Sequence, residues 1–258
     1  MMVIQDLILA YDKDAVIKNL SINLEKGSIT TIIGPNGCGK STLLKAMSRI
    51  LEPRQGDILL DGKSVFSIPS KDIAKQLAFL PQSQDIINGL TVFELISYGR
   101  YPYQKGMGKL SKDDLRAIHH AMDLTHVDDL KDRSIDQLSG GQRQRVWIAM
   151  SLAQETDMIF LDEPTTYLDI AHQLDVLHLL KDLNEKQGKT IVMVLHDINQ
   201  AASFSDEVIA LKEGQIVCAG KSEDVITRDI IQNVFNVKVD IMLNQTNQKP
   251  MTYNYRRL

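Results

Sequence analysis

The chain has 258 residues, of which 43% are hydrophobic and 24% are charged, a composition typical of an ordinary globular protein. This length allows one large α/β domain or at most two small ones. The 33 acidic residues outnumber the 29 basic ones and give a net charge of −4, which argues against a nucleic-acid partner.

The two cysteines, Cys38 and Cys218, do not form a CxxC pair, so we expect a reducing cytosol and no disulfide framework. Residues 1–11 lack the basic segment and the small-residue cleavage site of a signal peptide. No run approaches the roughly 18 apolar residues that a membrane span needs. If the protein acts at a membrane, we therefore expect it to do so through a partner.

The first eighty residues contain mostly strand-forming runs. The β-branched run at 28–33 predicts a buried strand that ends at Gly34. Helical periodicity begins at Lys40 and is expected to reach Leu51, before Pro53 and Gly56 stop it. The other elements expected here are strands at 3–10, 20–24 and 77–80, and a hairpin made by 57–60, the Asp61–Gly62 turn and the segment after it.

The middle of the chain, from Val92 to about Ala153, has helical patterns and no convincing strand. Within it, residues 110–122 predict a helix with Ser111 as its N-cap, and Asp113 and Asp114 are expected to be solvated in its first turn. The later elements are expected to be strands at 158–161 and 190–195, a helix at 171–186 closed by Gly188, a hairpin of 208–211 with 215–218, a helix at 229–235 and a hairpin of 237–243 with 251–255. The α/β parts are thus interrupted by a helical block.

Residues 34–42 match the phosphate-loop pattern GxxxxGK[ST], between the predicted strand and the predicted helix. Glycines let the backbone curl so that several N–H groups point at phosphate oxygens, and the helix dipole adds positive potential. Lys40 is expected to reach the β- and γ-phosphates and Ser41 to hold Mg²⁺. The predicted phosphate-binding residues are Gly34, Pro35, Asn36, Gly37, Cys38, Gly39, Lys40, Ser41 and Thr42.

The apolar run 158–161 is followed by two acids, Asp162 and Glu163. A buried strand that ends in carboxylates delivers them to the edge of the sheet where open α/β sheets bind ligands. We therefore expect Asp162 to anchor Mg²⁺ and Glu163 to act as general base on the attacking water. His196 ends the next apolar run and is expected at the same edge, where a structural role is equally open.

A second anion cradle is possible at Leu138–Gln142, because Ser139, Gly140 and Gly141 precede a helix predicted over 143–154. In isolation an ordinary N-cap is the simpler interpretation. The chain has one lysine-bearing phosphate loop, however, so the second cradle raises the possibility that it serves the ATP of a neighbouring subunit.

Together these segments resemble the ATP-binding cassette (ABC) ATPases over nearly the whole chain, and LSGGQ at 138–142 upstream of FLDEP is highly specific for them. The resemblance implies that Tyr11 stacks on the adenine and that Gln82 senses Mg²⁺ and the attacking water. It implies that Asp169 belongs to the D-loop, and that His196 is the switch histidine. Cys38 departs from the Ala or Ser of many members, and a thiol there predicts sensitivity to alkylating reagents.

The fold implied is α/β, a P-loop NTPase with a RecA-like core at about 1–86 and 155–235 and an antiparallel β-subdomain. A helical subdomain is expected at about 87–154 and a C-terminal hairpin extension at about 236–258. In this family two cassettes dimerise head to tail. Each ATP then lies between the phosphate loop of one subunit and Ser139, Gly140, Gly141 and Gln142 of the other, with a homodimer the common arrangement for importers.

A narrower likeness joins DEPTTYLDIAHQ at 162–173 and GRYPY at 99–103 to ATPases that drive import of iron–siderophore complexes, and more loosely of haem and cobalamin. It implies a peripheral protein on the cytoplasmic face of the membrane. The partner would be an integral membrane permease whose coupling helix docks near Gln82–Gln104, with an extracytoplasmic siderophore-binding protein acting indirectly.

Two alternatives come from other functional classes. A soluble ABC protein that works on DNA or ribosomes usually carries two cassettes or basic extensions, for which this length and negative charge leave no room. A nucleotide-binding regulator that never hydrolyses is opposed by the presence of Glu163.

Overall fold

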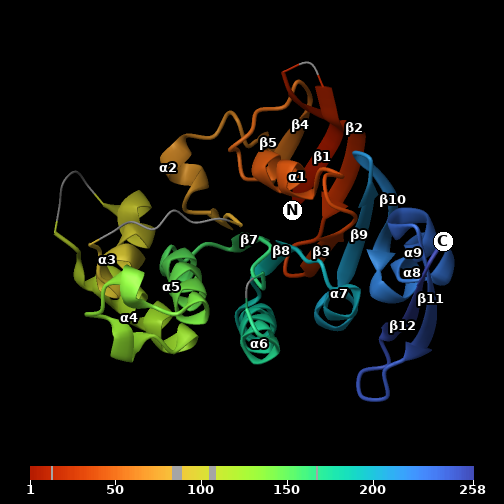
Figure 1. Cartoon of the computed structure of the whole chain (residues 1–258). Helices are drawn as coiled ribbons and strands as arrows, with labels where there is room; N and C mark the ends of the chain where they lie inside the picture. The colour runs from red at the N-terminus through yellow and green to blue at the C-terminus, as the bar shows by residue number, and fades with distance from the viewer. Residues whose placement is uncertain (13, 83–88, 105–108, 167) are drawn as a thin grey trace. The chain divides into compact units, whose positions relative to one another are not determined.

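The computed structural model describes residues 1–12, 14–82, 89–104, 109–166 and 168–258. The chain forms two compact units, one made of residues 1–68 and 190–258 and the other of residues 69–189. Figure 1 labels most of the helices and strands of both. Of the predicted coupling-helix contact at Gln82–Gln104, residues 83–88 lie outside the described residues, as does Tyr167.

The first unit contains the strands that carry the phosphate loop. Its elements are β1 (Met2–Tyr11), β2 (Asp14–Leu24), β3 (Ile29–Ile33), α1 (Lys40–Met47), β4 (Gln55–Leu60), β5 (Lys63–Ser64), β8 (Thr190–Val194), α7 (Ile198–Phe204), β9 (Glu207–Lys212), β10 (Gln215–Lys221), α8 (Ser222–Val225), α9 (Arg228–Phe235), β11 (Val237–Leu243) and β12 (Pro250–Arg257).

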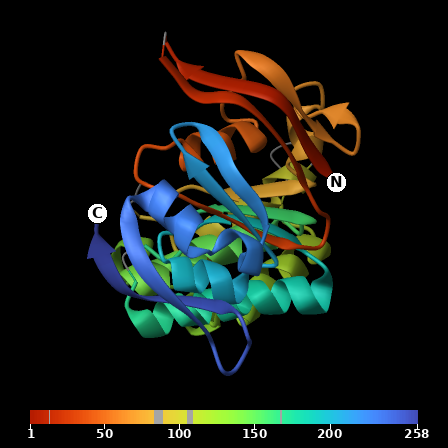
Figure 2. The same cartoon turned by 90° about the vertical axis from the view of Figure 1, so that its right-hand side faces the viewer.

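The strands of this unit pair in three groups. Strands β2-β1-β4-β5 form an antiparallel sheet, as the predicted β-subdomain requires. The order β10-β9-β3-β8 places β3 between two parallel neighbours, β9 and β8. Every residue of β3 and β8 is buried, because both faces of these strands are covered. The terminal strands β11 and β12 pair as the predicted hairpin, which packs beside α9 (Figure 2).

The second unit contains the helical block together with two strands. Its elements are α2 (Ser70–Ile73), β6 (Leu77–Leu80), α3 (Val92–Ser97), the 3₁₀ helix η1 (Tyr98–Tyr103), α4 (Lys112–Thr125), the 3₁₀ helices η2 (Asp128–Leu130) and η3 (Ile135–Gln137), α5 (Gly140–Ala153), β7 (Met158–Asp162) and α6 (Ile170–Gln187). Strand β6 pairs in parallel with β7.

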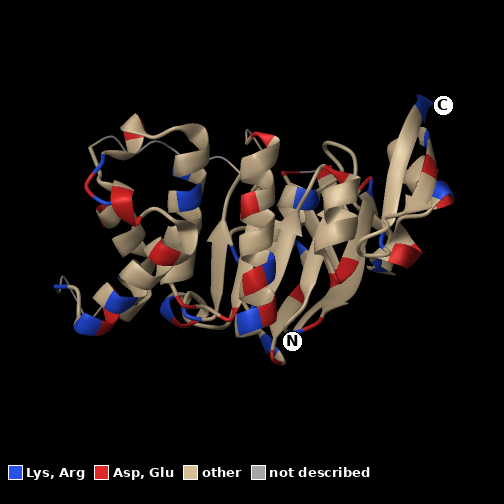
Figure 3. Ribbon diagram, turned by 90° about the horizontal axis from the view of Figure 1, so that it is seen from below, with Lys and Arg blue, Asp and Glu red and all other residues tan. Residues whose placement is uncertain are grey.

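Helices α3, α4 and α5 surround a shared apolar core. Its fully buried members include Leu95, Ile118 and Val146, and Trp147 packs against it partly buried. On α6, lysines pair with acids one turn away, Lys181 with Glu185 and Lys186 with Asp182, and Figure 3 shows basic and acidic residues interspersed along this helix. Within the described ranges, none of the helices combines the length and the apolar character needed to cross a bilayer.

Most predicted elements are confirmed, but several bounds were wrong. Helix α1 ends at Met47 rather than Leu51, because Arg49 adopts a left-handed φ of 62° and the Ser48 hydroxyl donates to the Leu44 carbonyl. Strand β2 begins at Asp14 rather than at Leu20. Its first half was missed because Asn19 has a left-handed φ of 52° and lies among register shifts in the pairing of β2 with β1. These irregularities interrupt the alternation of apolar and polar residues by which a strand is predicted from sequence. Helix α5 begins at Gly140 rather than Arg143.

The expectation that Asp114 is solvated was also wrong. Ser111 is the N-cap of α4 as predicted, and Asp113 is exposed. Asp114, however, is buried and pairs with the buried Arg100 at 2.8 Å. Three helices of four to seven residues, α2, α7 and α8, were not predicted because so few residues show no periodicity. The subdomain boundaries expected from the sequence remain a prediction.

Candidate functional site

The phosphate loop follows β3 and needs glycine where its backbone passes close to other strands. A Cβ on Gly34 would lie 2.2 Å from the Leu211 carbonyl oxygen of β9. Gly39 has a left-handed φ of 106°, and a Cβ there would lie 2.7 Å from Cδ1 of Ile17. The loop therefore tolerates no side chain at these two positions without moving its neighbours.

Hydrogen bonds from elsewhere in the first unit fix the loop in place. The Gly214 N–H, in the turn between β9 and β10, donates to the Cys38 carbonyl at 3.0 Å. The Lys18 N–H of β2 donates in turn to the Gly214 carbonyl at 3.0 Å. Within the loop, the Cys38 N–H donates to the Pro35 carbonyl at 3.3 Å. The phosphate loop is thus attached to the turn between β9 and β10, which is itself attached to β2.

Lys40 lies under the loop, with only 5% of its surface exposed. Its Nζ donates to the carbonyl oxygens of Gly34 at 2.9 Å and Pro35 at 3.0 Å. Helix α1 begins here, and its N-cap, Gly39, makes no side-chain hydrogen bond to the first turn. The combination of a lysine ammonium and helix N–H groups without a side-chain cap is well suited to an anion such as a phosphate.

Two other predicted residues, His196 and Tyr11, belong to this unit. Strands β3 and β8 are parallel with Ile32 opposite Val194, so Gly34 and His196, each two residues further on, emerge at the same edge. His196 is exposed. Tyr11, the last residue of β1, is 48% exposed.

In the second unit, Glu163 follows the buried Asp162 at the end of β7. Strands β6 and β7 are parallel with Leu80 opposite Leu161, so Gln82 and Glu163 also emerge side by side. The Gln82 amide Nε2 donates to Oε2 of Glu163 at 2.6 Å. Thr166 Oγ1 donates to the same oxygen at 3.0 Å. Two donors therefore orient one carboxylate oxygen.

Glu163 also has an unusual backbone conformation. Its φ of 54° lies in the left-handed region, which a glutamate seldom occupies. Non-glycine residues in that region cost about 1–3 kcal/mol and are concentrated at active sites. This strain turns the chain sharply between the strand and Pro164. The fold therefore holds the Glu163 backbone in a conformation that lowers the free energy of unfolding.

Ser139 is the N-cap of α5, in a capping box with Gln142. Its Oγ accepts from the Gln142 N–H at 3.3 Å, and its own N–H donates to Gln142 Oε1 at 3.1 Å. Gly140 and Gly141 form the first turn of the helix itself. Around Gly140 the space is open, with nothing within 4 Å of a Cβ built there. The N-terminal turn of α5 is thus open at Gly140.

His172 is a residue that the sequence interpretation missed. Asp169 is the N-cap of α6, and its Oδ1 accepts from the His172 N–H at 2.9 Å and lies 2.8 Å from the His172 ring Nδ1. These hydrogen bonds hold the pKa of Asp169 below its usual value. A Cβ on Gly141 would lie 3.1 Å from His172 Cδ2. His172 therefore brings Asp169 and Gly141 together, and only its place in LDIAHQ three residues after Asp169 could have indicated it.

Helix α5 is also joined by a hydrogen bond to the segment that carries Glu163. Gln144 of α5 donates from Nε2 to the carbonyl of Pro164 at 3.0 Å. Pro164 directly follows Glu163. Within this unit, Gln82, Glu163, Asp169 and the Ser139 loop are therefore joined by a continuous set of contacts.

Cys38 is buried, with 4% of its surface exposed. Burial raises the pKa of its thiol, and the nearby Lys40 offsets only part of that effect. The thiol is therefore a poor nucleophile, since the thiolate is the reactive form. The predicted sensitivity to alkylating reagents is not supported by this environment.

Comparison with known proteins identifies the family. Residues 17–166 match the family described as ABC transporter. The chain belongs to the ABC transporter family. Among curated relatives of this cassette, the iron(3+)-hydroxamate import ATP-binding protein FhuC of Bacillus subtilis (strain 168) is 49% identical over 97% of this chain and 93% of its own length. The ferric enterobactin transport ATP-binding protein FepC of Escherichia coli (strain K12) is 45% identical over 92% of this chain and 88% of its own.

Solved ABC structures agree with the fold. A transporter described as being of metal-chelate type, in an inward-facing conformation, matches all of this chain and 96% of its own with a TM-score of 0.85 and 29% identity. A dimeric cassette in a post-hydrolysis state, bound to ADP and Pi, matches 86% of this chain and 98% of its own with a TM-score of 0.76 and 30% identity. The predicted P-loop ABC fold is confirmed, and the chain is an ATP-binding cassette.

Proposed function

We propose that the protein is the ATPase subunit of an importer that carries an iron–siderophore complex through a partner membrane permease. The observation that carries this proposal is the alignment with the hydroxamate-import protein at 49% identity over 97% of the chain. That match aligns the chain with an ATP-binding subunit, so we assign selection of the cargo to the permease and to a siderophore-binding protein outside the cell.

The catalytic step is ATP hydrolysis, with water attacking the γ-phosphorus to give ADP and inorganic phosphate. Glu163 accepts the proton of the attacking water, and its carboxylate is oriented for this by Gln82 and Thr166. Lys40 turns from the loop carbonyls to the β- and γ-phosphates, and His196 donates to a γ-phosphate oxygen. Tyr11 stacks on the adenine, which its exposure permits.

Magnesium fits the oxygen-bearing side chains assigned to it. Ser41, Gln82 and Asp162 offer hydroxyl, amide and carboxylate oxygens, the hard ligands that Mg²⁺ prefers. The described residues contain no group of three or more His, Cys, Asp or Glu arranged to cage a metal. Mg²⁺ needs no such cage, because it commonly takes one or two protein ligands together with phosphate and water. Bound there, it would neutralise charge on the transferring phosphate.

We further propose that two copies of the chain pair head to tail on the cytoplasmic face of the membrane. The N-terminal turn of α5 at Gly140 and Gly141 then covers the γ-phosphate held by the partner's phosphate loop. The dimeric state of the ADP-bound cassette supports this arrangement. The permease docks near Gln82–Gln104.

The test is transport by the reconstituted complex. The chain is co-purified with its permease in lipid vesicles, and uptake of a ⁵⁵Fe-labelled hydroxamate siderophore is measured with ATP supplied on the cassette side. Uptake that requires ATP and is lost in Glu163→Gln supports the proposal. ATP hydrolysis without uptake of any ferric siderophore, but with uptake of haem or cobalamin, rejects siderophore as the cargo.

A further inference from the structure

The 3₁₀ helix η1 is joined to the last turn of α5 by direct backbone contact. A Cβ on Gly99 would lie 2.2 Å from the Met150 carbonyl oxygen and 3.2 Å from the Cβ of Ala153. No residue larger than glycine fits there without separating the two elements. The backbone of η1 therefore rests on the C-terminal turn of the helix whose N-terminus is Ser139.

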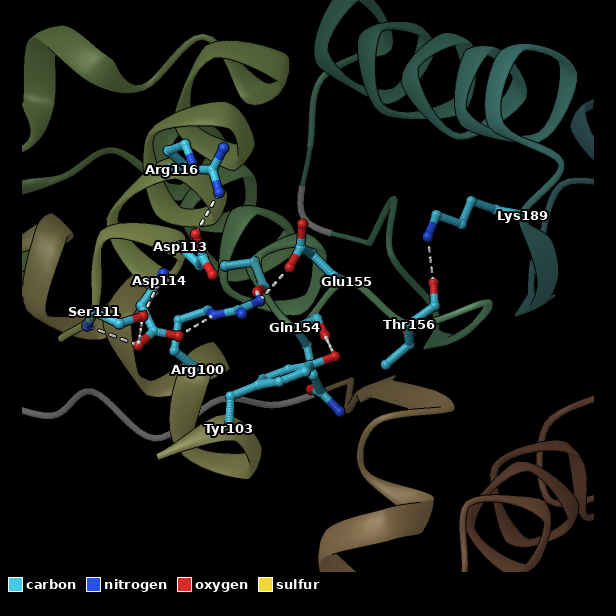
Figure 4. A network of polar contacts seen from close by, with 11 residues as sticks. Arg100, Tyr103, Ser111, Asp113, Asp114, Arg116, Gln154, Glu155, Thr156 and Lys189 are labelled. Atoms are coloured by element: carbon cyan, nitrogen blue, oxygen red, sulfur yellow. Dashed lines mark hydrogen bonds and ion pairs between the residues drawn. The ribbon is translucent and has the colours of Figure 1, made fainter. Parts of the chain in front are cut away.

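Arg100 fastens this contact. It is 3% exposed, and its Nη1 donates to the Ala153 carbonyl and to Glu155 Oε2, both at 2.7 Å. Its Nε donates to Asp114 Oδ1 at 2.8 Å. Figure 4 shows the guanidinium between these groups from three segments of the chain. One side chain thus binds η1 to the start of α4 and to the end of α5.

Tyr103 strengthens the same connection. The centroid of its ring lies 4.0 Å from Cζ of the Arg100 guanidinium. Its hydroxyl donates to the Gln154 carbonyl at 3.0 Å (Figure 4). Gln154 in turn donates from Nε2 to the Leu77 carbonyl of β6 at 3.0 Å. The end of α5 is therefore fixed both to η1 and to the strand that leads to Gln82.

Burying the Arg100–Asp114 pair has a high desolvation cost in free energy. Two charges lose most of their hydration on burial, and apolar residues of similar volume often give equal or greater stability. Burial acts to raise the pKa of Asp114, but the hydrogen bonds from Arg100 and Ser111 together outweigh it and hold that pKa below its usual value. Such a charged cluster specifies one orientation of the joined elements, which apolar packing does less well.

The outer side of η1 carries two exposed aromatic residues. Tyr98 is 53% and Tyr101 75% exposed, whereas Gly99, Arg100 and Pro102 between and beside them are buried. The two tyrosines are three residues apart, one turn of a 3₁₀ helix, so they point to the same side. Exposed tyrosines on a rigid backbone are typical of protein contacts.

We propose that Arg100 is a positioning residue that makes η1 and α5 one mechanical unit, so that a permease bound at Tyr98 and Tyr101 moves the Ser139 end of α5. This inference rests on the proposed function as a permease-coupled ATPase. Helix α5 has 14 residues and is about 21 Å long, and it packs into the apolar core along its length. A displacement at its C-terminal turn therefore appears at Ser139, where the partner's nucleotide is covered.

The experiment compares the isolated chain with its complex with the permease in lipid nanodiscs. Turnover and KM for ATP are measured in both for wild type, Arg100→Lys, Glu155→Gln and the conservative Glu155→Asp. Glu155 is 55% exposed, so its variants keep the fold. Asp113→Asn is the matched control, because this carboxylate is adjacent to Asp114 but pairs with Arg116 on the surface.

We expect the isolated variants to hydrolyse ATP within about twofold of wild type with unchanged KM. In the complex, stimulation of turnover by the permease should fall at least about fivefold in Arg100→Lys and Glu155→Gln, within the range usual for coupling between sites. Glu155→Asp should retain at least half of it, and Asp113→Asn all of it.

Three results contradict the inference. If the permease still stimulates turnover in both Arg100→Lys and Glu155→Gln, the role of Arg100 is overturned and the transport function is not affected. Equal losses in the isolated chain and in the complex, with a lowered melting temperature, assign Arg100 a purely structural role. A wild-type complex whose turnover does not respond to the permease overturns the transport function as well.

Discussion

Replacing Asp114 by Asn tests the buried ion pair of the helical block most sharply. The substitution keeps the side-chain shape but removes the charge that faces Arg100, whose side chain is 4% exposed. Removing one partner of a buried pair costs about 3–5 kcal/mol. Arg100 retains Glu155 and the Ala153 carbonyl, so we expect the lower end, about 3 kcal/mol. Asp113→Asn, which breaks an exposed pair, should cost less than about 1 kcal/mol.

Thermal unfolding followed by circular dichroism measures both variants. A loss of about 3 kcal/mol corresponds to a fall in Tm of about 6–12 °C for a chain of this size. The pKa of Asp114 is lowered in the folded protein, so its contribution is complete above the ordinary aspartate pKa of about 3.9 and is lost as the pH falls through the lowered value. The Tm difference between wild type and Asp114→Asn should therefore shrink below about pH 4. Equal Tm values for Asp114→Asn and Asp113→Asn at pH 7 would refute the reasoning.

Three further predictions concern the nucleotide site. Lys40→Ala should weaken ATP binding at least about tenfold in a fluorescent-nucleotide titration, because the loop loses its buried cation, and unchanged affinity would contradict this assignment. N-ethylmaleimide should label Cys218 before Cys38 in the native chain, as read by peptide mass spectrometry, since burial raises the pKa of Cys38; early loss of the Cys38 peptide would reverse that conclusion. Gly141→Ala should lower ATPase activity by crowding the His172 ring at 3.1 Å, and adding His172→Ala should restore part of it if this contact is the cause.

The phosphate loop and the acid pair could be predicted from sequence because each depends on neighbouring residues. Gly34 to Thr42 needs only a strand before it and a helix after it, and both are present. Asp162 and Glu163 follow an apolar run that is buried as a strand. Local order was sufficient for these residues. Gln82 was indicated only by the family resemblance, because its place beside Glu163 depends on the parallel pairing of β6 with β7.

The remaining contacts depend on segments distant in the sequence. Asp114 has the local pattern of an exposed first-turn acid, and its burial is decided by Arg100, 14 residues earlier, and by the end of α5. His172 has the pattern of a helix-face histidine, and its role depends on Gly141, which comes from another helix. The left-handed φ of Glu163 has no signal in the sequence at all. Tertiary packing sets these features, so periodicity and motif spacing could not predict them.

Release of inorganic phosphate by the reconstituted complex, with and without Mg²⁺, tests the central claim most directly. Wild type should hydrolyse ATP only when Mg²⁺ is present, and Glu163→Gln should lose about 10²–10⁴-fold in turnover while still binding ATP and accumulating as a dimer. Equal phosphate release by wild type and Glu163→Gln would show that Glu163 is not the base. No release by either, with the permease present, would contradict the assignment of the chain as an ATPase.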